Sequence, residues 1–160
     1  MSSRKPCVLF ICTGNVCRSP MAEYLLRNRL GKRACWTVAS AGLCTCGGMA
    51  PSANAVGVMR EDGIDLTPHR SASASKEIID AAAMIVVMTS EHAEEIKRRF
   101  PEAGDRIYLL KSFISRRGGD VPDPLGGNME HYRKVREEIK SSLSNLIKYM
   151  EACAGEKSGD

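Results

Sequence analysis

The sequence has no long apolar run and no dominant block of like charge. The 160 residues contain no stretch of about 18 consecutive apolar residues, the length that a membrane-spanning helix needs. Residues 1–6 show no signal-peptide pattern, and the net charge of +4 comes without a lysine and arginine block. We therefore expect a cytoplasmic protein that binds neither membranes nor nucleic acids.

The cysteine pattern also excludes some kinds of site. Seven cysteines are an odd number, which favours free thiols in a reducing compartment over a framework of disulfides. Cys44 and Cys46 are spaced as metal ligands could be, but no matching pair of Cys or His lies nearby, so loop thiols are the better interpretation. We expect no metal and no cofactor.

The chain alternates apolar runs with helical patterns and shows no internal repeat. This alternation predicts right-handed parallel crossovers and one α/β domain, a doubly wound, four-stranded parallel sheet with helices on both faces. The domain is expected over residues 1–151, before a frayed tail at 152–160. Strands are predicted at 8–11, 36–39, 84–88 and 107–110, and helices at 20–30, 51–62, 75–82, 90–100 and 128–150.

The most informative stretch begins at the first buried strand and ends at a helix start. Val8 to Ile11 is a continuous apolar run, typical of a strand covered on both faces. Ser19-Pro20 predicts an N-cap hydroxyl followed by proline at the first helical position, and Gly14 and Asn15 permit the tight turn between. A loop curled in front of a helix N-terminus directs backbone N–H groups at one spot, which binds an anion.

This loop holds one thiol and one guanidinium, six positions apart. The helix dipole, the loop amides and Arg18 should stabilise the Cys12 thiolate, and Ser19 could donate to its sulfur. Arg18 offers a planar fork that matches two oxygens of a tetrahedral anion, as lysine cannot. The alternative is that Cys12 is an inert buried thiol and Arg18 is a surface charge. The predicted phosphate-binding loop consists of Thr13, Gly14, Asn15, Val16, Cys17, Arg18 and Ser19.

These residues read CTGNVCRSP, which resembles the signature of the low-molecular-weight protein tyrosine phosphatase family. The resemblance covers most of the chain, continuing through Ser40-Ala41-Gly42 to Asp123-Pro124 before the last helix. It implies a flavodoxin-like fold, with Cys12 as nucleophile, Arg18 as phosphate clamp and Asp123 as general acid.

Asp123 lies far from Cys12 in sequence, in a loop predicted over residues 111–127. The loops that follow parallel strands open at one edge of the sheet, so this loop can lie over Cys12. Prolines on both sides hold the backbone of Asp123 stiff, which suits a carboxyl group that must meet a leaving group. Asp120 is the competing carboxylate.

Two further residues are expected to support the loop. In the family a histidine braces the asparagine of the phosphate loop, so the resemblance makes His69 a supporting partner of Asn15; a solvent-facing His69 is the alternative. Cys17 is close enough to Cys12 around a tight loop for a disulfide to form, which would protect the nucleophile reversibly. A buried structural thiol is the other interpretation of Cys17.

The substrate is predicted from residues that flank the motifs. Tyrosine-specific members commonly carry aromatic residues after the Asp-Pro pair and a bulkier apolar residue at the position of Thr13. Here Leu125-Gly126-Gly127 follows instead, so the chain resembles the protein arginine phosphatase branch and phosphoarginine is favoured. Phosphotyrosine is the alternative, because Tyr132 or the 43–50 loop could supply an aromatic wall.

The prediction is thus hydrolysis of phosphorylated protein or peptide side chains through a phosphocysteine, with inorganic phosphate as product. An arsenate reductase is less favoured because no cysteine lies between Cys46 and Cys153 to act as a relay. A phosphate-binding module without turnover or a nucleotide-binding protein would leave the thiol, the guanidinium and the carboxyl group without a purpose.

Overall fold

A computed structural model describes residues 4–156. Within them, four parallel strands form one sheet in the order β2-β1-β3-β4. From β1 the chain adds β2 on one side of the sheet and then β3 on the other side. The loop after β1 therefore lies at the topological switch point, where open parallel sheets bind ligands. The strands are β1 (Cys7–Cys12), β2 (Thr37–Gly42), β3 (Met84–Val87) and β4 (Ile107–Leu109).

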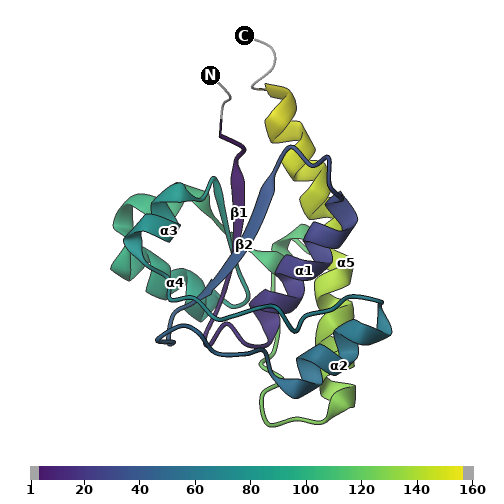
Figure 1. Ribbon diagram of the computed structural model, residues 1–160. Helices are drawn as coiled ribbons and strands as arrows, with labels where there is room; N and C mark the ends of the chain where they lie inside the picture. Colours follow the sequence, from purple (N-terminus) through teal and green to yellow (C-terminus); the bar gives the residue numbers. More distant parts are fainter. Residues whose placement is uncertain (1–3, 157–160) are drawn as a thin grey trace.

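Helices cover both faces of the sheet, which confirms the predicted α/β architecture (Figure 1). One face carries α1 and α5, with α2 packed beside α5, and the other carries α3 and α4. The helices are α1 (Arg18–Leu30), α2 (Ala53–Glu61), α3 (Lys76–Ala81), α4 (Ser90–Arg99) and α5 (Met129–Glu156), with short 3-10 turns at Pro101–Arg106 and Leu110–Phe113.

Two apolar clusters form the core, one on each face of the sheet. Val8 and Phe10 of β1 point into the cluster beneath α1 and α5, whereas Leu9 and Ile11 point into the one beneath α3 and α4. All four are fully buried. Burial on both faces explains the unbroken apolar run of the central strand. This packing fixes the carboxyl end of β1, where the functional loop begins.

Some element boundaries differ from the prediction. The second strand continues through Ser40, Ala41 and Gly42, beyond its predicted end at residue 39, because β1 extends to Cys12 and pairs with them residue by residue. The second helix begins at Ala53 rather than Pro51, since the Ser52 side chain accepts from the amide of Ala55 and caps it. The long loop before residue 127 is not structureless, because it opens with a 3-10 turn.

The C-terminal helix is longer than the sequence pattern indicates. Helix α5 continues to Glu156, so the expected frayed tail from residue 152 begins too early. Ala152 and Ala154 are strong helix formers and prolong the helix past its last buried turn. Residues 157–160 of the expected tail lie outside the described part. In residues 4–156 no helix is both long and apolar enough to cross a bilayer.

Candidate active site

The Cys12 thiol lies at the end of β1, buried, and receives hydrogen bonds from the loop that follows. The backbone amide of Asn15 donates to its sulfur at 3.3 Å, and the Ser19 hydroxyl lies 2.8 Å from the sulfur. Asn15 Nδ2 donates to Ser19 Oγ, so the hydroxyl hydrogen of Ser19 is free to point at the sulfur. The sulfur therefore has two hydrogen-bonding groups directed at it from the loop and the start of α1.

Asn15 connects this loop to the sheet through a buried network. Its backbone adopts the left-handed conformation with φ 57°, whereas Gly14 does not, so Asn15 makes the turn that the sequence assigned to both. Its side-chain oxygen accepts from the amide of Ala72, and its amide nitrogen donates to Ser40. Ser40 in turn donates to the buried Glu23 at 2.5 Å. Ser40 was expected only as part of the resemblance, with no partner assigned, and Glu23 was not predicted.

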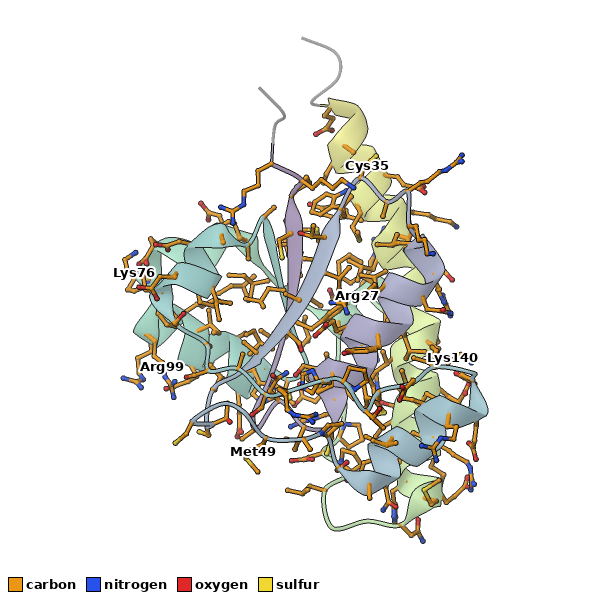
Figure 2. All side chains as sticks on the ribbon, viewed as in Figure 1. Arg27, Cys35, Met49, Lys76, Arg99 and Lys140 are labelled. Atoms are coloured by element: carbon orange, nitrogen blue, oxygen red, sulfur yellow. The ribbon has the colours of Figure 1, made fainter. Side chains whose placement is uncertain are left out.

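Arg27 completes this network on the outer side. Figure 2 places Arg27 on α1 beside β2, where its guanidinium pairs with Glu23 and donates to the carbonyl of Val38. The Glu23 carboxylate, buried in the protein, is therefore compensated by a charge and a hydroxyl. A satisfied network of this kind holds the Asn15 side chain in one orientation.

The loop also depends on a close backbone approach at Gly42, the last residue of β2. A Cβ atom at this position would lie 2.8 Å from the carbonyl oxygen of Thr13 and 3.0 Å from Cβ of Asn15. Real side chains do not approach backbone this closely, so only glycine lets β2 run beneath the loop. The strand pairing of Cys12 with Gly42 brings the two segments together.

The predicted cap at Ser19 is wrong. Helix α1 begins at Arg18 with Cys17 in the cap position and no side-chain cap, because the hydroxyl of Ser19 is used by Cys12 and Asn15. Pro20 is the third helical residue, which still lacks an intrahelical acceptor for an N–H group. The helix N-terminus nevertheless faces the loop, as an anion site requires.

Arg18 is buried at the start of α1 and reaches across the site. Its Nη1 donates to the carbonyl of Val121 at 2.9 Å, while its Nη2 lies 3.5 Å from Thr13 Oγ1 and 3.5 Å from Asp123 Oδ2. The guanidinium therefore joins the loop after β1 to the loop before α5. A fork fixed on both sides presents its remaining N–H groups to an anion in a set direction.

The structure separates the two candidate carboxylates. Asp123 is 47% exposed, with one oxygen facing Arg18 and the other accepting from the amide of Leu125. Asp120 instead accepts from the amide and hydroxyl of Ser90, at the N-terminus of α4. Val121 between them donates to the carbonyl of Met88 and so ties the loop to the end of β3. Of the two carboxylates, Asp123 is therefore the one that faces Arg18, whereas Asp120 binds the N-terminus of α4.

His69 is buried and lies against the loop, not in solvent. Its Nε2 donates to the carbonyl oxygen of Asn15 at 2.8 Å, and its Nδ1 lies 4.0 Å from Glu23. The contact is therefore to the backbone of Asn15 rather than to its side chain. Because this carbonyl belongs to the left-handed turn residue, His69 supports the loop conformation directly.

Cys17 is buried beneath the loop between two hydroxyl groups. Its sulfur lies 3.3 Å from Ser52 Oγ and 3.4 Å from the hydroxyl of Tyr132. Burial raises the pKa of the Cys17 thiol. Burial also raises the pKa of the Tyr132 hydroxyl, which reaches about 12. Tyr132 is 2% exposed and residues 43–50 contain no aromatic side chain, so neither forms the aromatic wall considered from the sequence.

His92 is a residue of the site that the sequence did not reveal. It lies in the first turn of α4, and its Nε2 is 2.9 Å from the hydroxyl of Thr13. Burial, and then the positive charge of Arg18, lower the pKa of His92 to about 4, so the imidazole is neutral at pH 7. Its place just after β3, which neighbours β1, was the signal that could have identified it.

Two cavities flank Asp123. One of about 310 Å³ is bordered by Thr13, Arg18 and His92 together with the carboxylates of Glu91 and Asp120. The other, about 400 Å³, lies against α5 and is bordered by Leu125, which is 65% exposed. Neither lining includes a Tyr, Phe or Trp. Within residues 4–156 no cluster of three metal-binding side chains occurs.

The family model for low molecular weight phosphotyrosine protein phosphatases matches residues 7–155. The chain belongs to this family. A relative from Geobacillus stearothermophilus, named a protein-arginine-phosphatase, is 42% identical over 90% of this chain and 95% of its own. The low molecular weight protein-tyrosine phosphatase A of Mycobacterium tuberculosis is 38% identical over 87% and 88%. The family thus includes named phosphatases of both kinds.

A solved structure of the family bears on the chemistry of the site. It is a variant of the YwlE arginine phosphatase with a phosphorylated active-site serine. It is 32% identical to this chain, covers 91% of it and 95% of its own chain, and has a TM-score of 0.83. The low-molecular-weight phosphatase fold expected from the sequence is confirmed, and the present protein is a phosphatase of this family.

Proposed function

We propose that this phosphatase hydrolyses phosphoarginine in proteins or peptides, with Cys12 as nucleophile, Arg18 as phosphate clamp and Asp123 as general acid and base. The observation that carries the proposal is the meeting of a hydrogen-bonded thiol, a tethered guanidinium and an exposed carboxyl group at one sheet edge. These three groups supply a nucleophile, a charge clamp and a proton carrier.

The reaction has two steps. The Cys12 thiolate attacks phosphorus in line, an S–P bond forms, and the P–N bond breaks as Asp123 delivers its proton to the departing guanidine nitrogen. Asp123, now ionised, takes a proton from water. That water attacks phosphorus, the S–P bond breaks, and inorganic phosphate leaves with the thiolate restored. Arg18 and the loop amides hold the phosphoryl oxygens throughout.

Several features support phosphoarginine over phosphotyrosine. Besides Asp123, the cavity beside Arg18 is lined by Asp120 and Glu91, whose negative charge suits a basic guanidine leaving group better than a phenol. The exposed apolar residue next to Asp123 is Leu125, with no aromatic ring in either cavity lining. Relatives named arginine phosphatases support the same choice. The family description, which names phosphotyrosine, supports the alternative.

The proposal is tested by kcat/KM on matched phosphoarginine and phosphotyrosine peptides, for the parent and for Thr13→Ile. We expect the parent to prefer phosphoarginine by roughly tenfold or more, because discrimination between two leaving groups appears in this ratio. Thr13→Ile should reverse or remove the preference, since the exposed Thr13 borders the cavity beside Arg18. A parent that prefers phosphotyrosine would establish the alternative instead.

We further propose that Cys17 protects Cys12 from irreversible oxidation. A peroxide oxidises the Cys12 thiolate to a sulfenic acid. Attack of the Cys17 thiolate on its sulfur forms the disulfide and expels hydroxide, which takes a proton to become water, and a reducing thiol later restores both cysteines. All seven cysteines are free thiols in the structure, which fits the reducing cytoplasm that we propose for the protein. Because burial raises the pKa of Cys17, only a small fraction of this thiol is ionised near pH 7. The thiolate fraction increases as the pH is raised.

This role predicts a pH-dependent recovery after peroxide. The parent should regain most of its activity with dithiothreitol, and the regained fraction should increase from pH 7 to pH 9 as Cys17 ionises. Cys17→Ser should lose most of the recovery, whereas the exposed Cys35→Ser serves as control and should recover like the parent. Equal recovery of Cys17→Ser and parent would assign Cys17 a packing role only.

A further inference from the structure

We propose that His92 is a positioning residue that sets the orientation of Arg18 through the hydroxyl of Thr13. The inference rests on the proposed role of Arg18 as the phosphate clamp. It is carried by one oxygen: Thr13 Oγ1 lies 2.9 Å from His92 Nε2 and 3.5 Å from Arg18 Nη2. His92 lies at the carboxyl end of β3 and Thr13 at that of β1, so the contact joins two neighbouring strand ends.

The histidine is itself held in place. Its backbone amide donates to Thr89 Oγ1, the cap of α4, and the residue is only 6% exposed. Helix α4 begins at Ser90, whose amide is bound by Asp120. A ring fixed at this helix start presents its Nε2 at a defined point. The contact with Nε2 then holds the side chain of Thr13, an otherwise exposed residue, in one rotamer.

The charge state of His92 suits this role. Burial and the nearby Arg18 keep the ring neutral at pH 7, against the weaker opposite effects of Asp120 and Asp123. A neutral ring can share a hydrogen bond with Thr13 without repelling the guanidinium, as a protonated ring or a lysine would. The positive charge of the Arg18 guanidinium therefore remains available to bind the phosphoryl group.

A simple packing role does not account for the imidazole. Its Nδ1 is buried and has no hydrogen-bond partner in the described part of the chain. An unpartnered buried nitrogen costs stability, and an aliphatic side chain of similar size would avoid that cost. The cost is understandable if the other nitrogen, Nε2, has a function. The contact of Nε2 with Thr13 supplies one.

Tethering Arg18 at several points has a physical benefit for catalysis. Its Nη1 is fixed by the carbonyl of Val121, and its Nη2 faces both Thr13 and Asp123. Asp123 is the group that must move its proton and meet the substrate, so it is a poor anchor. The Thr13 hydroxyl, oriented by His92, keeps the plane of the guanidinium constant while Asp123 transfers its proton.

The test uses two amide substitutions that differ by one methylene. In His92→Gln the side chain can still reach the Thr13 hydroxyl, whereas in His92→Asn it is too short. Calorimetric titration with inorganic phosphate measures the dissociation constant for the anion that Arg18 binds, and it needs no turnover. We expect His92→Asn to raise the dissociation constant for phosphate about tenfold and to lower kcat/KM similarly, and His92→Gln to stay within about threefold of the parent.

Two further variants separate positioning from general damage. If His92 acts through Thr13, the double variant His92→Asn, Thr13→Val binds phosphate no more weakly than Thr13→Val alone. Glu94→Ala, an exposed change on the same helix, should leave phosphate affinity unchanged. The inference is overturned if His92→Asn and His92→Gln bind phosphate equally well, or if the two single effects multiply. If the parent binds phosphate but hydrolyses no phosphorylated substrate, the proposed function fails independently.

Discussion

Replacing Cys12 with serine should reduce turnover by roughly 10⁴-fold or more, because an alcohol is a far weaker nucleophile than a thiolate in this cradle. The fold should persist, since the smaller hydroxyl can keep the contacts with Ser19 and the amide of Asn15. Steady-state hydrolysis of a phosphoarginine peptide and of an aryl phosphate measures the loss.

The serine variant also offers a second observation. In a solved variant of the YwlE arginine phosphatase, a serine that replaces a cysteine in the active site is phosphorylated. By analogy, Cys12→Ser should slowly accumulate a stable phosphoserine at position 12, visible by mass spectrometry, whereas Cys12→Ala should not. Cys35→Ser, at an exposed cysteine far from the loop in sequence, is the matched control and should keep the parent's turnover. Retention of activity in Cys12→Ser would assign the nucleophile to another group.

The change from Asp123 to asparagine should lower kcat/KM on a phosphoarginine peptide by roughly 10²- to 10⁴-fold, the usual contribution of a general acid. With an aryl phosphate whose phenol is electron-poor, the same variant should lose much less of the parent's kcat/KM, because this leaving group departs without a proton. Its kcat should still fall, since the second step needs Asp123 as base. The difference between the two substrates identifies proton transfer to the leaving group.

Asp120→Asn is the control that the chain itself provides. Its carboxylate lies in the same loop and borders the same cavity, but it is bound by the amide and hydroxyl of Ser90. We expect its kcat/KM to stay within a few-fold of the parent, with a small loss of stability from the weakened N-terminus of α4. Interchanged effects of the two variants would make Asp120 the acid.

The sequence predicted the parts of the site that lie in one continuous segment. The positions of Cys12 and Arg18 follow directly from the strand and the turn residues, because their geometry is local, whereas α1 begins two residues before the predicted start at Pro20. Asp123 could also be predicted, since parallel strands bring their loops to one edge of the sheet. For Ser19 the sequence suggested both a helix cap and a contact with the Cys12 sulfur, and the structure shows the contact with sulfur but no cap.

The residues that were missed depend on register and packing. Ser40 reaches Asn15 only because β2 pairs with β1 up to Gly42, and Glu23 meets Ser40 because α1 packs over that strand. His92 contacts Thr13 from 79 positions away in the chain. No local pattern records such contacts; they arise once the order of the strands is known.

The central claim, that the phosphoryl group passes through the Cys12 sulfur, is tested most directly by acid quenching. The Asp123→Asn variant, mixed with an aryl phosphate whose phenol is electron-poor, should release about one equivalent of phenol in a burst. Mass spectrometry of the quenched protein should then locate one phosphoryl group on the peptide that contains Cys12. Continued hydrolysis with no burst and no phosphoryl group on Cys12 would contradict the account.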